Sequence, residues 1–308
     1  MKLHLCYSHF SLSESHAKSI KHLNDMFKEV SDFKQSIDYE DVSMNIANDI
    51  LITKYYGLSI QEQVLNLTNQ DQMYLATFQN RLFQEWFNGD NFSLSTEELI
   101  CKSTQPKSDL KDGYYVGYLP KINHYNIHNK VKDVCEINNK YDYLLSYYPI
   151  DNKSWYRRAK SRYLNLFFQE EAGSTLNKVD DGFCNYTIAF TKCMIALNDF
   201  SPTGIISTKD KVKHINALTT YECTEEGNSH QNFKFKFSEN DKVVNSLDCQ
   251  FHLKPSENNR VGDQTFYYKR LYFGFFPIDT NQWQVAVAAI GPHITTHNKK
   301  DRYEKPRR

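Results

Sequence analysis

Four polar side chains that could take part in chemistry lie in two short segments near the C-terminal end of the sequence. CQFHLKP contributes His252 and Lys254, and YYKRLYFGFF contributes Arg270 and Tyr272. An imidazole can accept a proton from a ribose 2′-hydroxyl, while cationic side chains stabilise the charge that develops on a phosphate. Arginine also pairs with phosphate oxygens, and tyrosine stacks on bases. Without a cluster of carboxylates, these residue types predict metal-independent RNA cleavage or simple RNA binding.

Strand alternation should place these four side chains on one face of a sheet. Apolar residues alternate with His252 and Lys254 in the first segment and with Arg270 and Tyr272 in the second. If the two strands are neighbours, the four polar side chains converge on one open face. His293, which follows Gly-Pro after a third strand-like run, is a second imidazole within reach. The simpler alternative is a solvated sheet face that carries ordinary polar residues.

A second candidate surface is a dense cluster of basic residues interleaved with aromatic ones. Such a cluster could bind the phosphates of a nucleic acid, although a solvated helix face is the simpler and preferred explanation. Its basic members are Arg157, Arg158, Lys160 and Arg162.

Neither a metal ion nor a cofactor is expected from the motifs. His124 and His128 have the i and i+4 spacing of helical metal ligands, but the neighbouring asparagines favour a loop and no HExxH motif occurs. The sequence also lacks the P-loop, the dinucleotide-binding glycine motif and GxSxG. A metal-dependent nuclease is disfavoured because no cluster of carboxylates accompanies the basic residues.

The composition predicts a soluble cytoplasmic protein. Lys plus Arg and Asp plus Glu each number 37, so any nucleic-acid site must be a local patch rather than a general basic field. The seven cysteines are odd in number and form no CxxC pair, as expected for reduced thiols. The sequence contains no secretory signal and no apolar stretch long enough to span a bilayer, so no membrane partner is expected.

Hydrophobic periodicity predicts an α+β fold with a mainly helical N-terminal region and a C-terminal antiparallel or mixed sheet. Helices are expected after a capping box at Ser11, over residues 42–51, after a capping box at Ser59, and over 71–87, 154–168, 185–200 and 212–218. Strands are expected over residues 112–120, 140–149, 233–237, 249–254, 266–276 and 282–291. The Pro-Gly segment at 201–204 suggests three parts: residues 1–200, mainly helical with a few short strands; a sheet domain over 205–298; and a charged tail over 299–308.

Three motifs near the C-terminus resemble the closing segment of a group of uncharacterised bacterial proteins associated with anti-phage defence islands. Those proteins carry a His-x-Lys segment, an Arg-Ile-x-Phe strand and an Ile-Gly-Pro-x-Ile-Thr motif. The corresponding residues here are His252 and Lys254, then Arg270, Leu271 and Phe273, then Ile290 to Thr295. The match covers about fifty residues, and the helix from Asp71 to Trp86 looks like one that these proteins carry near their start.

The strand order and the basic face are also similar to those of RelE-like toxins, which cleave RNA without a metal. This chain differs from them in its long preceding helical region and its neutral charge. Together the resemblances imply a defence-associated effector that acts on RNA or another nucleic acid. The alternative they leave open is a non-catalytic sensor or adaptor subunit of a defence complex, which would use the same face to bind other subunits.

Overall fold

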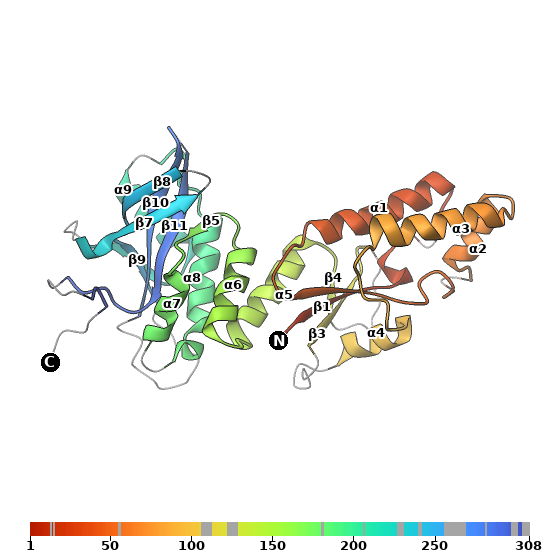
Figure 1. The fold of residues 1–308 in the computed structure, drawn as a ribbon, viewed down its shortest axis with the longest axis horizontal. Coiled ribbons are helices and arrows are strands. Elements are labelled where there is room, and N and C mark those ends of the chain that lie inside the picture. Colours follow the sequence, from red (N-terminus) through yellow and green to blue (C-terminus); the bar gives the residue numbers. More distant parts are fainter. Residues whose placement is uncertain are drawn as a thin grey trace. The chain divides into compact units, whose positions relative to one another are not determined.

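The helices and strands of the chain pack into two units, residues 1–141 and 142–308, in the computed structural model (Figure 1). The structure describes residues 1–12, 14, 16–54, 57–105, 113–121, 129–179, 182–205, 207–226, 231–239, 242–255, 269–280, 282–296 and 301–303. His124 and His128 lie outside these ranges.

The first unit is built on a parallel sheet. Its strand order is β2-β1-β3-β4, with β1 (Leu3–Tyr7) between β2 (Val42–Ile46) and β3 (Tyr114–Tyr118), and β4 (Lys130–Val131) at the edge beside β3. Parallel neighbours need crossover connections, and described helices lie between β1 and β2 and between β2 and β3 along the chain. Helices α1 (Ile20–Gln35) and α3 (Gln72–Arg81) lie on one side of this sheet, and α4 (Thr96–Thr104) lies on the other (Figure 1).

The helices of the first unit start where side-chain caps are available. The bounds are α1 (Ile20–Gln35), α2 (Ile60–Leu67), α3 (Gln72–Arg81), a π-helical turn (Leu82–Trp86), α4 (Thr96–Thr104) and α5 (Val134–Tyr147), with a 3-10 turn at His9–Ser11. Ser59 and Glu62 form the capping box expected at the start of α2. The first helix begins later than expected, because Ser19 rather than Ser11 caps α1.

Two of the expected elements in this region are wrong. Residues 42–46 form strand β2 rather than the start of a helix, since Val42, Met44 and Ile46 repeat with the period of two that pairs with β1. Residues 140–147, expected as a strand, belong to α5. Tyr141 and Leu144 are buried there at a helical spacing of three.

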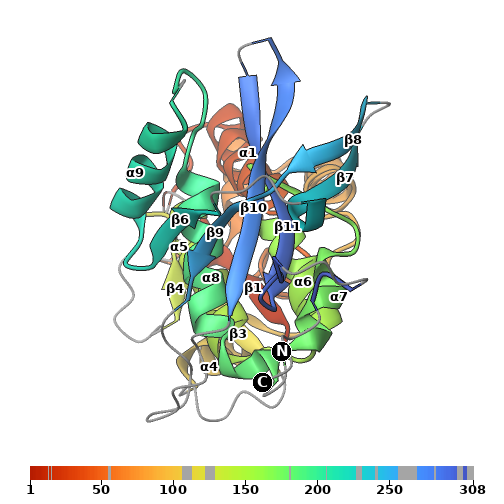
Figure 2. The ribbon, with the colours of Figure 1, turned by 90° about the vertical axis from the view of Figure 1, so that its left-hand side faces the viewer.

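The second unit contains a mixed five-stranded sheet and a separate hairpin (Figure 2). The sheet order is β5 (Leu166–Phe168), β11 (Gln282–Gly291), β10 (Arg270–Asp279), β9 (Phe251–Lys254) and β6 (Glu222–Glu225). Only the β5–β11 pair is parallel among these strands. The hairpin consists of β7 (Lys234–Glu239) and β8 (Lys242–Asp248). The α+β class and the mixed C-terminal sheet are confirmed.

Helices and the hairpin cover the sheet on both faces. The helices are α6 (Asn152–Arg162), α7 (Ala172–Thr175), α8 (Thr187–Asp199) and α9 (Thr208–Leu218), with 3-10 turns at Leu176–Lys178, Phe183–Asn185 and Gln231–Phe233. On one face, Phe237 of the hairpin packs in a buried cluster with Tyr272 and Phe276. On the other, Phe200, directly after α8, contacts Phe275. The centre of the sheet is therefore buried from both sides.

The expected division at residues 201–204 falls inside the second unit. Strand β5, which precedes this segment, pairs with β11, which follows it. The hydroxyl of Thr175 also donates to the carbonyl of Ile290, and the amide of Ile290 donates back to that hydroxyl. These bonds join the helical stretch before residue 201 to the sheet, so the division between the units lies at Tyr141 and Asp142 instead.

No helix in the described part of the chain is long and apolar enough to cross a membrane.

Candidate functional site

A cross-strand row of three side chains forms the centre of the candidate site in the second unit. Strand pairing places Thr224 of β6 opposite His252 of β9, and His252 opposite Tyr272 of β10. The hydroxyl oxygen of Thr224 lies 2.9 Å from Nε2 of His252. The rings of His252 and Tyr272 have centroids 5.2 Å apart. The expected pairing of the two polar strands is thus present.

A second cross-strand row lies two residues along the strands from the first and contains charged residues. Glu222 lies opposite Lys254, and their side chains form an ion pair with an N to O distance of 3.0 Å. Arg270 lies opposite Gly291, the last residue of β11, and His293 follows two residues later. The end of β11 therefore brings the second imidazole to the side of the sheet that carries Arg270.

Burial separates these residues into a buried pair and an accessible group. His252 is 2% exposed and Tyr272 is fully buried, so the open face expected around them is wrong at this point. The hydroxyl of Tyr272 accepts a hydrogen bond of 3.1 Å from the backbone N–H of Ile294, inside the core. Tyr272 is therefore placed to fix the chain beside His293 rather than to stack on a base. His293 itself is exposed.

The positive charge of Arg270 affects the pKa of both histidines. Burial, followed by the positive charge of Arg270, lowers the pKa of His252 from 6.5 to about 3, so this imidazole is neutral at pH 7. Desolvation by the surrounding chain and the same guanidinium also lower the pKa of His293, although the residue as a whole is exposed. The Arg270 charge thus lies near both imidazoles.

A carboxylate that the sequence analysis missed accompanies these cations. Oε1 of Glu226 lies 3.8 Å from Nε2 of His252, and its side chain is 32% exposed. Its negative charge raises the pKa of both Arg270 and His293, which places it near each of them. The alternation of Tyr221 and Cys223 with polar residues was a period-two signal for strand β6, which would have brought Glu226 beside the site.

The basic cluster of α6 does not act as one surface. Arg158 is 3% exposed, and Arg162 forms an ion pair of 2.9 Å with Asp142 in which both side chains are about nine-tenths buried. Arg157 and Lys160 are exposed. Arg158 is buried and Arg162 is paired with Asp142, so only two of the four basic residues are exposed. Their positions therefore do not support contact of all four with a nucleic acid.

In the ranges that the structure describes, no three His, Cys, Asp or Glu side chains are grouped so that they could hold a metal ion. Comparison of the chain with protein-family models, with curated protein sequences and with solved structures gives no match. The resemblance to defence-associated proteins and to RelE-like toxins therefore stays a prediction.

Proposed function

We propose that the second unit binds RNA at the surface formed by Arg270, His293, Lys254 and Glu226, and cleaves it without a metal ion. The observation that carries this proposal is the position of Arg270, which pairs with Gly291 two residues before the exposed His293. A guanidinium binds phosphate oxygens in pairs, and an imidazole beside it can exchange protons with the ribose.

His293 is the proton acceptor in this proposal, because it is exposed whereas His252 is buried. Because its pKa lies below the usual 6.5, the imidazole is mostly neutral at pH 7 and can take the proton of a 2′-hydroxyl. The 2′-oxygen then forms a bond to phosphorus while the bond to the 5′-oxygen breaks, and water supplies the proton to the leaving oxygen. The products are a 2′,3′-cyclic phosphate and a free 5′-hydroxyl.

The charged neighbours stabilise the two charges that this step creates. Arg270 and Lys254 face the negative charge on the phosphate oxygens, as preorganised cations do in phosphoryl chemistry. Glu226 stabilises the imidazolium that forms on His293, since its carboxylate already raises the pKa of that residue. The buried His252 and Tyr272 act as positioning residues, because they have almost no exposed surface to offer a substrate.

A cytoplasmic location and a role in defence belong to the same proposal. The seven cysteines are all free thiols, and four of them are buried, which fits a reducing compartment. The defence role rests on the three C-terminal motifs alone.

The test is incubation of the full chain with end-labelled RNA in the presence of EDTA. Cleavage that yields a 2′,3′-cyclic phosphate, and that is lost in His293→Ala and in Arg270→Ala, supports the proposal. The matched control is Lys160→Ala, which removes an exposed cation of α6 and should leave cleavage unchanged. If the folded wild-type chain neither cleaves nor binds RNA, or if His293→Ala cleaves as fast as wild type, the proposal fails.

A further inference from the structure

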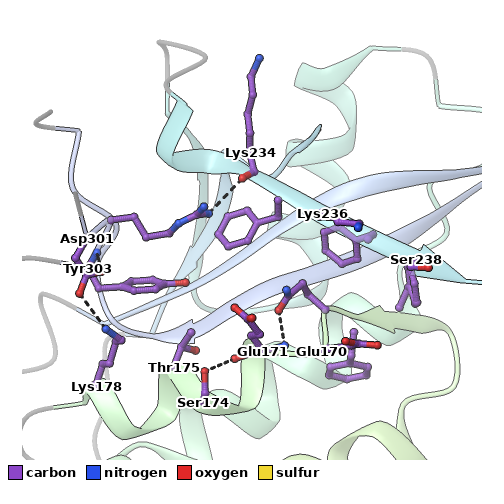
Figure 3. Close-up of a pocket in the computed structure, with 16 residues that line it drawn as sticks. Glu170, Glu171, Ser174, Thr175, Lys178, Lys234, Lys236, Ser238, Asp301 and Tyr303 are labelled. Carbon is purple, nitrogen blue, oxygen red and sulfur yellow. Dashed lines mark hydrogen bonds and ion pairs between the residues drawn. The ribbon is translucent and has the colours of Figure 1, made fainter. Parts of the chain in front are cut away.

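An open trough with a volume of about 850 Å³ lies in the second unit, between the hairpin strand β7 and the segment that runs from β5 into α7 (Figure 3). Lys234, Lys236 and Ser238 follow one wall along β7. Glu170, Glu171 and Ser174 lie on the opposite wall. The trough is lined by residues other than the RNA-site residues proposed above.

Both walls of the trough are outer edges of sheets. Strand β7 is at the edge of the two-stranded sheet, and β5 is at the edge of the five-stranded sheet. Residues 234–238 of β7 line the trough, but no described residue of its partner β8 does. Likewise, Phe167 and Phe168 of β5 line the trough, whereas no described residue of the neighbouring strand β11 does. The sides of β5 and β7 that face the trough are therefore the sides away from their partners.

The backbone of β7 is oriented to accept another strand. Nη1 of Arg302 donates to the carbonyl of Lys234 at 3.3 Å, so this carbonyl points toward the trough. In an antiparallel pair, the N–H and C=O of every second residue point away from the partner. The hairpin has a β-bulge between Phe235 and Phe237, and its extra residue lies in β8. The backbone groups of β7 therefore continue to point alternately toward β8 and away from it. The N–H and C=O of Lys236 and Ser238 should thus face the trough as well.

The charges on this edge define what could pair with it. Phe235 and Phe237 point into the core, and Lys234 and Lys236 alternate with them on the outer face, where the Lys234 side chain points away from the trough (Figure 3). A second copy of β7 would bring lysines opposite lysines, which is unfavourable. Acidic side chains at alternate positions would instead form cross-strand pairs with the lysines, and apolar ones would lie beside Phe167.

A polyanion fits the trough less well than a polypeptide. The carboxylates of Glu170 and Glu171 are exposed on the wall opposite the lysines. Two of the other cations are already engaged, since Lys178 pairs with Asp301 at 3.1 Å and Arg302 donates to backbone carbonyls. The charge of the trough is therefore close to balanced, whereas a nucleic-acid groove carries a clear excess of cations.

We infer that the trough binds an extended polypeptide segment of a partner protein, with alternating apolar and acidic residues, which adds as a strand to the outer edge of β7. The added segment would receive and donate hydrogen bonds at Lys236 and Ser238. This inference is independent of the proposed RNA site.

The test uses the full chain and a fluorescein-labelled heptapeptide of alternating valine and glutamate, with binding followed by fluorescence anisotropy. Saturable binding is expected, together with slower amide hydrogen exchange at Lys236 and Ser238. Lys236→Pro removes an outward N–H and should weaken binding by about tenfold or more, since one backbone hydrogen bond and its geometry are lost. Lys236→Ala is the matched control, because it keeps the N–H and should weaken binding only about threefold.

Several results would overturn the inference. One is absence of saturable binding of the heptapeptide, and another is equal binding by Lys236→Pro and wild type. Unfolding of the hairpin in Lys236→Pro would place that N–H in the ladder with β8, because proline is tolerated at an edge only where the N–H faces outward. Binding of a labelled decamer of uridylate that is lost in Lys236→Glu would make the trough a nucleic-acid site instead.

Discussion

The hydroxyl of Thr224 lies 2.9 Å from Nε2 of His252 on the neighbouring strand, and this contact holds a neutral imidazole in the core of the second unit. His252 is 2% exposed, and its pKa is lowered to about 3 by burial first and by Arg270 second. The proton that an unfolded chain would bind near pH 6.5 is therefore excluded from the folded one.

The first prediction is a loss of stability in mild acid. Because the pKa of His252 is lower in the folded than in the unfolded chain, the unfolded chain binds more protons below pH 6.5, and the free energy of unfolding falls as the pH falls. Between about pH 6 and pH 4 the contribution is roughly 1.4 kcal/mol per pH unit. Urea unfolding of wild type and of His252→Gln at pH 7 and pH 5 measures it.

In His252→Gln, the free energy of unfolding should fall less between pH 7 and pH 5 than in wild type, whatever the stability of the variant at pH 7. His214→Gln is the control, because it makes the same substitution at an exposed histidine on α9. An equal slope in wild type and in His252→Gln would show that His252 does not carry the effect.

The second prediction concerns the pH profile of RNA cleavage. If neutral His293 accepts the proton, the rate rises with pH and reaches half of its maximum below pH 6.5, because the pKa of His293 is lowered by desolvation and by Arg270. Glu226 raises that pKa, so Glu226→Gln should move the midpoint to lower pH. Initial rates from pH 4 to 8 test this, and a midpoint that stays unchanged or moves upward in Glu226→Gln would exclude the assigned role of the carboxylate.

The third prediction concerns the stability contributions of a buried and an exposed arginine of α6. Arg162→Ala removes the partner of Asp142 in a pair that is about nine-tenths buried, and should lower the free energy of unfolding by roughly 3 kcal/mol. Arg157→Ala changes an exposed side chain and should change it by less than about 0.5 kcal/mol. Urea unfolding of both variants gives the comparison, and similar losses in the two would contradict a structural role confined to Arg162.

The alternation of polar and apolar residues was enough to predict that His252 and Tyr272 share one face, since a strand has a fixed period of two. It could not reveal that this face is covered. The covering hairpin, β7 and β8, lies between residues 234 and 248, and its packing on Tyr272 depends on contacts that leave no periodic signal. Glu226 was missed for a different reason: the short period-two pattern at Tyr221 and Cys223 was not assigned as a strand, so its pairing with β9 was not considered.

The division of the chain into units was predicted at the wrong place because one short strand was not recognised. Strand β5 has three residues, Leu166–Phe168, and the sequence there continues the apolar pattern of the preceding helix. Its pairing with β11 moves the division between the units from about residue 201 to residue 141. The capping box at Ser59 was predictable because it depends only on residues three apart.

The fourth prediction concerns Gly291, which ends β11 and leads to His293. Its φ of +107° favours glycine, and a Cβ there would meet Cγ2 of Val179 at 2.4 Å. Gly291→Ala should therefore lower the free energy of unfolding by roughly 2 kcal/mol, and it should also reduce RNA cleavage by displacing His293. Gly204→Ala is the matched control, since Gly204 has a φ of +80° with no atom within 4 Å of the added Cβ. Urea unfolding and cleavage rates of both variants separate the two effects: Gly204→Ala should lose about 1 kcal/mol from backbone strain alone and cleave like wild type. If Gly291→Ala is folded and cleaves at the wild-type rate, the turn does not position His293 for catalysis.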